Sequence, residues 1–115
     1  MPLITKLPAT VDALWEPVAP EKILSGEPQT RTRVLYENAA EHLYAGEWEA
    51  TVGAWRIAYT EWEYIRVLSG RCVVTGDDGV AVEAGAGESF VIEPGFTGIW
   101  EVTETMHKLW VIREV

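Results

Sequence analysis

The chain has 115 residues, of which 48% are hydrophobic, and its 18 acidic and 9 basic residues give a formal charge of −9. This length suits one domain with a packed core. The negative charge repels nucleic-acid phosphates and anionic lipids, so we expect neither nucleic acid nor membrane as a partner. A solvated acidic surface explains the charge, and an acidic pocket for a cationic ligand is the alternative.

The cysteine content and the N-terminal residues bear on location. Cys72 is the single cysteine, so neither an intramolecular disulfide nor a cysteine-rich zinc site can form. The opening residues MPLITKLPAT lack the uninterrupted apolar core of a signal peptide, and no window approaches the roughly 18 apolar residues of a membrane span. These features predict a protein of the cytoplasm.

Residues 1–29 form the first predicted unit, an irregular N-terminal arm. Five of the six prolines lie in it, at Pro2, Pro8, Pro17, Pro20 and Pro28. Because proline lacks an amide donor and has a fixed φ, we expect little regular structure beyond one helical turn near PEKILSG. The arm packs either on its own domain or on a partner subunit, and the sequence leaves both possibilities open.

Residues 30–115 form the second predicted unit, in which apolar residues recur with a period of two. Runs rich in Val, Ile, Tyr and Trp alternate with Gly, Asp and Pro turn signals. One such signal, Asp77-Asp78-Gly79, suits the positive φ angles of a tight hairpin. We expect strands at 31–36, 42–50, 53–59, 62–68, 71–76, 79–84, 88–92, 97–103 and 107–114. The pattern predicts an all-β sandwich or barrel.

Four segments, in this order, resemble the cupin superfamily: GEWEATVGAW, EYIRVLSGRCVVTGDDG, GAGESFVIEPGFTGIWEV and HKLWVIRE. The resemblance is narrower to small single-domain cupins similar to the cupin domains of ureidoglycine aminohydrolase and the ethanolamine-utilisation cupin. Its marker residues here are Trp48, Glu49, Gly95, Phe96, Gly98, Trp100 and Lys108. It implies a jelly-roll β-barrel that is commonly a homodimer with exchanged N-terminal strands. Such a fold does not by itself define a chemistry.

The resemblance also locates the metal-binding positions of cupins. Glu63 stands at the glutamate position, whereas Ile57, Tyr59 and Gly98 occupy the three histidine positions. One carboxylate holds a transition metal poorly, because imidazole nitrogens supply most of the bonding. The only imidazoles, His42 and His107, fall on other strands. We therefore expect no metal and no cofactor.

Strand alternation predicts a pocket inside the barrel. Side chains two residues apart share a face. If the cupin histidine positions face the interior, as the resemblance implies, then one set of aromatic residues and one acid also face inward, beside space left by Gly98. A largely apolar pocket with one carboxylate would orient a cation, an amine or an amide donor, and aromatic faces would add cation–π attraction. The predicted ligand-binding residues are Trp55, Ile57, Tyr59, Glu63, Trp100 and Lys108.

Structural interpretations of the same residues remain open. Tryptophans also serve as core residues. A buried Glu63 needs a partner, and Arg56, Arg66 and Lys108 are candidates, with Lys108 favoured if its strand borders the motif strands. Without a cation, Glu63 would suit acid–base catalysis together with Tyr59.

Two other acids are interpreted as non-functional. Glu61 lies in the turn TEWE and is taken as solvated, and Glu88 is taken as a residue that stabilises a turn.

The sequence favours a small-molecule-binding cupin for a polar nitrogen-containing metabolite. One alternative is an enzyme of the aminohydrolase or ethanolamine-utilisation type, in which Glu63 and Tyr59 are the catalytic acid–base groups. A second alternative is a dimeric interaction module without catalysis.

Overall fold

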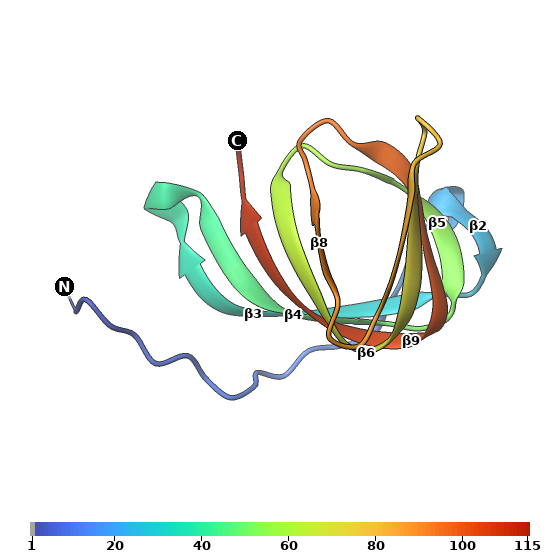
Figure 1. Ribbon diagram of the computed structural model, residues 1–115. Coiled ribbons are helices and arrows are strands. Elements are labelled where there is room, and N and C mark those ends of the chain that lie inside the picture. The colour runs from blue at the N-terminus through green and yellow to red at the C-terminus, as the bar shows by residue number, and fades with distance from the viewer. Residues whose placement is uncertain (1) are drawn as a thin grey trace.

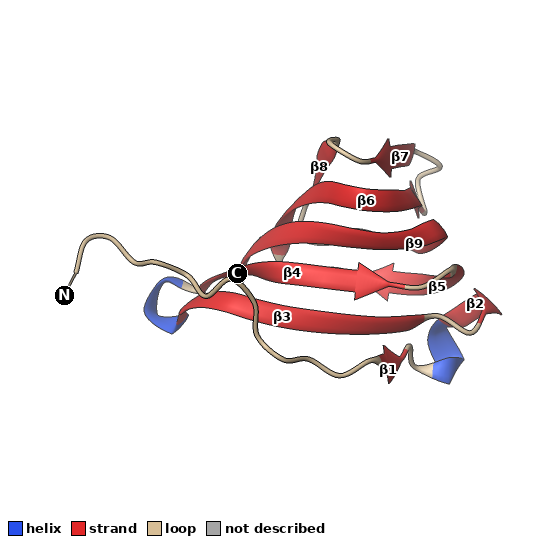
Figure 2. Ribbon diagram, turned by 90° about the horizontal axis from the view of Figure 1, so that it is seen from below, coloured by secondary structure: helices blue, strands red, loops and turns tan. Residues whose placement is uncertain are grey.

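The computed structural model describes residues 2–115, which form antiparallel strands rolled into an open barrel (Figure 1). Figure 2 shows the long strands lying side by side in one curved layer. The elements in chain order are β1 (Glu16–Pro17), η1 (Pro20–Lys22), β2 (Ile23–Gly26), β3 (Gln29–Asn38), η2 (Ala39–Glu41), β4 (Leu43–Ala50), β5 (Gly53–Ala58), β6 (Trp62–Gly76), β7 (Ala81–Gly85), β8 (Ser89–Ile92) and β9 (Thr97–Arg113). The predicted all-β jelly-roll class is confirmed. No helix in residues 2–115 has the length and apolar character needed to cross a membrane.

The long strands β6 and β9 hold the barrel together, because they pair with each other over most of their length. The first half of β9 also pairs with β5, and β5 pairs with β2. The second half of β9 pairs with β4, and β4 pairs with β3. β8 and β7 pair with the first and second halves of β6. These strands belong to one continuous sheet. It folds along β6 and β9 into two halves, here called the two sheets of the barrel, and both halves contain parts of β6 and β9.

A sharp corner divides each of the two shared strands. The sequence predicted separate strands at 62–68 and 71–76, and again at 97–103 and 107–114, but each pair forms one continuous strand. The β6–β9 register shifts three times between Val67 and Cys72, and Gly70 has a φ of 80°. Such bulges bend a strand and increase its twist without ending it. The apparent turn signals thus mark corners of the barrel.

The core is built from inward-facing residues of these same strands. Its largest members include Ile65, Val67, Val74, Trp100, Val102 and Met106, all almost fully buried. Each such side chain contributes about 1.5–3 kcal/mol to folding through removal of its surface from water. Cys72 lies in the same core. Burial raises the pKa of its thiol to about 11, although the positive charges of Lys108 and Arg71 act to lower it. The thiol is therefore a poor nucleophile.

The residues at the tips of two turns explain the conformations of those turns. Gly79 has a φ of 87°, and the Asp78 carboxylate accepts a hydrogen bond from the Val80 amide at 3.0 Å, which confirms the predicted hairpin. Glu88 accepts a hydrogen bond from the Gly85 amide at 2.8 Å, so its predicted turn-stabilising role is also confirmed.

The N-terminal arm is more regular than its prolines suggested. The predicted helical turn is present as η1, but β1 pairs with the start of β3 and β2 pairs with β5. The segment ahead of β1 contacts β3 through Arg33, whose Nε donates to the Val11 carbonyl at 3.0 Å, and through Arg31, whose Cζ lies 4.5 Å from the centre of the Trp15 ring. In this chain the arm packs on its own domain, and its first residues extend away from the barrel (Figure 1).

Candidate ligand pocket

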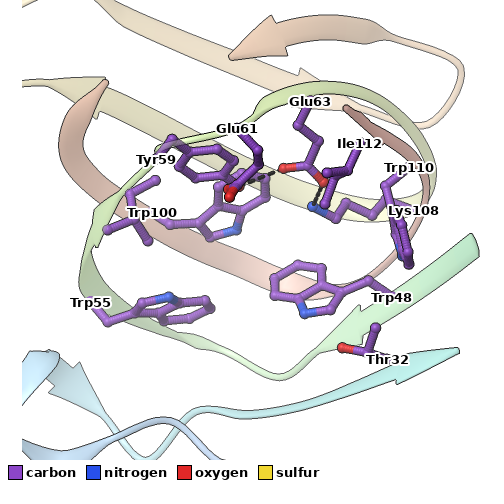
Figure 3. Close-up of a pocket in the computed structure, with 11 residues that line it drawn as sticks. Thr32, Trp48, Trp55, Tyr59, Glu61, Glu63, Trp100, Lys108, Trp110 and Ile112 are labelled. Carbon is purple, nitrogen blue, oxygen red and sulfur yellow. Dashed lines mark hydrogen bonds and ion pairs between the residues drawn. The ribbon is translucent and has the colours of Figure 1, made fainter. Parts of the chain in front are cut away.

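A cavity of about 240 Å³ lies inside the barrel, between β4, β5, β6 and β9. All six residues predicted from the sequence to bind a ligand line it, so the fold brings them together as expected. Their role in binding stays a prediction. The complete lining comprises Thr32, Trp48, Trp55, Ile57, Tyr59, Glu61, Glu63, Trp100, Lys108, Trp110 and Ile112 (Figure 3).

Strand pairing explains why these residues meet. Trp55 on β5 lies opposite Trp100 on β9, and Trp48 on β4 lies opposite Lys108 further along β9. Glu63 comes from the first half of β6, which pairs with the same part of β9 that carries Lys108. Because β9 contributes to both sheets, it delivers Trp100 and Lys108 to one cavity although they are on opposite sides of its corner.

Glu63 and Lys108 form a buried ion pair on the cavity wall. The two residues are only 3% and 4% exposed, and Lys108 Nζ lies 2.9 Å from Glu63 Oε2. Tyr59 Oη donates a hydrogen bond to the other oxygen, Glu63 Oε1, at 2.5 Å (Figure 3). Lys108 is thus the partner that the sequence favoured for Glu63. Of the other two candidates, Arg56 binds Asp77 at 3.0 Å, and Arg66 is exposed.

Tyr59 is a neutral hydrogen-bond donor in this arrangement. Burial raises the pKa of its phenol far above the usual value, and the negative charges of Glu63 and Glu61 raise it further. A phenol in that state donates to the carboxylate but does not ionise near neutral pH. Tyr59 therefore fixes the orientation of Glu63 and is not a ready general base.

The ammonium group of Lys108 also faces two indole rings. Its Nζ lies 4.5 Å from the ring centre of Trp48 and 4.6 Å from that of Trp100. The two rings meet edge to face, with centres 5.4 Å apart. Aromatic faces attract cations, so the charge of Lys108 is balanced by Glu63 on one side and by π-systems on the other. The pair is well suited to a structural role.

The residues of the cavity do not fit a transition metal. The histidine positions of metal-binding cupins hold Ile57, Tyr59 and Gly98, and the remaining carboxylate is already bonded to an ammonium group and a phenol. In residues 2–115 no group of three or more His, Cys, Asp or Glu side chains could hold a metal ion. His107 instead lies 3.3 Å from Glu47, and His42 follows η2 in the left-handed region, with a φ of 56°.

One predicted feature of the pocket is wrong. Gly98 was expected to leave space beside the aromatic residues, but it does not line the cavity. A Cβ atom at Gly98 would meet the Thr75 carbonyl oxygen of β6 and would lie 2.9 Å from the Phe96 ring. The glycine therefore permits close approach of β6 to β9 and opens no room for a ligand.

Sequence reasoning missed five lining residues: Thr32, Trp48, Glu61, Trp110 and Ile112. Trp110 and Ile112 follow Lys108 at intervals of two along the strand, so the alternation of side chains could have placed them on the same face as Lys108. Trp48 and Thr32 depend on the register between strands, which no local pattern reveals. Glu61 was taken as a solvated turn residue, and its place in the cavity wall, where it is half-buried, was missed. Tyr59 explains the difference, since its amide and carbonyl bond to Phe96 and Gly95 and hold the short turn against the barrel.

The model of the EutQ-like cupin domain matches residues 37–110, which is more than half of the chain. The chain belongs to the EutQ-like cupin family. The matched region of this EutQ-like cupin contains every pocket-lining residue except Thr32 and Ile112. No curated protein sequence matches the chain.

Solved structures agree with the fold of this EutQ-like cupin. A DUF861-family protein of unknown function from Pseudomonas syringae pv. tomato has a TM-score of 0.79 at 22% identity, over 89% of this chain and 44% of that one. EutQ from Clostridium difficile has a TM-score of 0.69 at 20% identity, over 76% of this chain and 64% of that one. A putative ethanolamine utilization protein Q from Salmonella typhimurium has a TM-score of 0.67 at 15% identity, over 91% of this chain and 98% of that one. The chain spans less than two thirds of the first two proteins.

Glu49, which follows Trp48 in the family motif, binds two arginines outside the cavity. Its carboxylate accepts hydrogen bonds from Arg31 Nε at 2.6 Å and from Arg33 Nη1 at 2.9 Å. Burial alone would raise the pKa of Glu49, but these hydrogen bonds and charges lower it below the ordinary value of 4.5. The ion pairs of Glu49 with Arg31 and Arg33 thus join β4 to β3 beside the N-terminal arm.

We expect Glu49→Gln to reduce the loss of stability in acid. A lowered folded-state pKa contributes stability that is fully present above the unfolded value, and this contribution is lost as pH falls through the folded value. The variant should lose about 1 kcal/mol near neutral pH and much less near pH ~3, as measured by urea unfolding at both pH values. Glu83→Gln, which removes an exposed partner of Arg71, is the matched control and should change little. An equal loss at both pH values would contradict this assignment.

Proposed function

We propose that this EutQ-like cupin binds a small nitrogen-containing metabolite in its tryptophan-lined cavity. The observation that carries the proposal is the cavity itself, in which four indole side chains surround a neutralised ion pair. Its volume of about 240 Å³ is below the roughly 300–1,000 Å³ typical of sites for drug-sized ligands, so it suits a compact molecule. An apolar wall with few polar groups is the usual form of such a site.

The comparisons support this proposal only in outline. Two of the similar structures are described as EutQ or as an ethanolamine utilization protein, and those words apply to those proteins. A nitrogen-containing ligand for this chain is consistent with such relatives. Identities of 15% and 20% carry the fold alone, so the ligand has to be argued from the cavity.

An enzyme with Glu63 and Tyr59 as acid–base groups is the weaker candidate. Both groups are already bonded to each other, and Glu63 is also bonded to Lys108. A proton transfer through Glu63 would require a substrate to displace a buried ammonium group, which costs free energy. A purely structural module is weaker still, because the cavity would then have no role. Homodimer formation and a cytoplasmic location stay predictions from the sequence.

A fluorescence titration against a panel of small metabolites tests the binding proposal. At least one nitrogen-containing compound should change the tryptophan emission in a saturable way, because several indoles face the cavity. Trp48→Phe should weaken that binding about threefold or more, since it removes part of the wall. Trp15→Phe is the control, because Trp15 lies on the arm beside Arg31 and outside the cavity. No saturable response to any compound would overturn the proposal.

A further inference from the structure

We propose that Glu61 is the residue that recognises the ligand, and that the ligand carries a compact organic ammonium group. The inference rests on the proposed function and deepens it. It moves cation recognition away from Glu63, the residue that the sequence suggested, to a carboxylate in the connection between β5 and β6.

Glu63 is not available to a ligand cation. One of its oxygens accepts from Lys108 at 2.9 Å and the other accepts from Tyr59 at 2.5 Å. A ligand ammonium group that displaced Lys108 would leave a lysine charge buried at 4% exposure without its partner. Separating a buried ion pair in this way is strongly unfavourable. The inner wall of the cavity is thus electrically balanced before any ligand enters.

Glu61 is the second carboxylate of the cavity, and its charge is not balanced. Within residues 2–115 no basic side chain lies within ion-pair distance of it, and its one hydrogen bond is a long contact of 3.5 Å from the Thr60 hydroxyl. Glu61 also lines an adjoining cavity together with Lys22 and Arg56. Arg56 binds Asp77 instead, and Lys22 forms no ion pair with Glu61 among the described residues. The charge of Glu61 reaches the cavity, because it helps to raise the pKa of Tyr59.

The walls facing Glu61 suit a cation better than an anion or a carbonyl group. In Figure 3, Glu61 lies on the same side of the cavity as Tyr59, and Trp55 and Trp48 lie opposite. The ring centres of Trp48 and Trp55 are 6.2 Å apart and their planes are inclined at 56°, so two neighbouring indoles form this wall. The Nε1 atoms of Trp100 and Trp110 each expose less than 1 Å² and have no hydrogen-bond partner in the described part of the chain. Those two indoles therefore offer no accessible N–H donor to a ligand in the cavity.

A free carboxylate beside aromatic faces is the combination that binds ammonium groups. The carboxylate supplies charge and hydrogen-bond acceptors, and the rings attract the remaining positive surface of the cation. The cavity is small enough that the cation must be compact. The net charge of −9 further favours approach of cations from solution.

Three probes of nearly equal size and shape test this assignment in the full chain. Propylammonium, 1-propanol and propionate are titrated at constant ionic strength while tryptophan fluorescence is followed. We expect saturable binding of propylammonium and at least about tenfold weaker binding of the other two, because only the first carries positive charge. Glu61→Gln should weaken propylammonium binding about tenfold and leave the melting temperature unchanged, since Glu61 makes no ion pair with the described residues. Glu101→Gln, at an exposed acid on β9, is the control and should bind like the parent protein.

The outcomes separate this inference from the proposed function. If 1-propanol or propionate binds as tightly as propylammonium, or if Glu61→Gln binds unchanged while Trp48→Phe binds more weakly, the cavity takes ligands but the ammonium assignment is wrong. If propylammonium shows no saturable binding, the assignment is also wrong, and the metabolite panel then decides separately whether the cavity binds any small molecule.

Discussion

Lys108→Met is expected to destabilise the fold by about 3–5 kcal/mol. The substitution keeps much of the side-chain volume but removes the ammonium group that lies 2.9 Å from Glu63, so a carboxylate that is 3% exposed loses its cation. A buried charge without a partner costs far more than the pair contributes. Urea unfolding of the variant and the parent protein, followed by tryptophan fluorescence, measures the difference.

A second substitution distinguishes loss of the partner from loss of packing. In Lys108→Met combined with Glu63→Gln the uncompensated charge is gone, and the amide can still accept from Tyr59, so most of the stability should return. Arg71→Met, which breaks an exposed pair with Glu83, should cost less than about 1 kcal/mol. If the double variant is as unstable as Lys108→Met alone, the effect comes from contacts with Trp48 and Trp100 and the charge argument fails.

Gly70→Ala is expected to cost about 3 kcal/mol. Gly70 has a φ of 80° at the corner of β6, a conformation that a residue with a Cβ atom adopts only with strain. An added Cβ would also meet the Thr105 carbonyl oxygen and the Met106 backbone on β9. Both strands would have to separate at the point where the two sheets join. The midpoint of urea unfolding measures the loss.

Gly79→Ala is the matched control for that experiment. Gly79 has a similar φ of 87°, but nothing lies within 4 Å of an added Cβ atom. The control thus carries the backbone strain without the steric contact, and we expect it to cost about 1 kcal/mol. Equal losses for the two variants would show that the corner tolerates a methyl group and that close approach of β6 and β9 is not required.

The class of fold and the inner wall of the pocket were accessible from sequence patterns. A period of two groups the residues on each face of a strand, and the resemblance to cupins indicated the inner face; together they placed Trp55, Tyr59, Glu63 and Trp100 inside the barrel. The ordered motifs placed Lys108 on a late strand and made it a candidate partner of Glu63. These inferences succeeded because each depends on neighbours within one strand or on spacing along the chain.

The errors share a different cause. Glu61 was taken as a solvated residue of a short turn, and its position at the cavity was missed. Its real position depends on two backbone hydrogen bonds of Tyr59, whose amide donates to the Phe96 carbonyl and whose carbonyl accepts from the Gly95 amide, residues more than 30 positions away in the chain. Gly98 was taken as a gap in the pocket, whereas it faces the backbone of β6 at Thr75. Contacts of this kind involve segments far apart in the sequence, and residue type alone does not report them.

Alternation and composition were enough to predict an all-β domain, because they report which side chains share a face of a strand. The resemblance to cupins indicated which face is the inner one, and so predicted an aromatic interior with one inward carboxylate at Glu63. Whether that carboxylate is free was a question of register. The pairing of β6 with β9 puts Lys108 against Glu63, and the pairing of β4 with β9 puts Trp48 beside Lys108. Register is set by the packing of the whole barrel, since a shift of one residue would turn every side chain of a strand to the other face. For that reason the negative charge that we propose is available to a ligand lies on Glu61. This residue is in the connection between β5 and β6, where the alternation of strand residues predicts nothing.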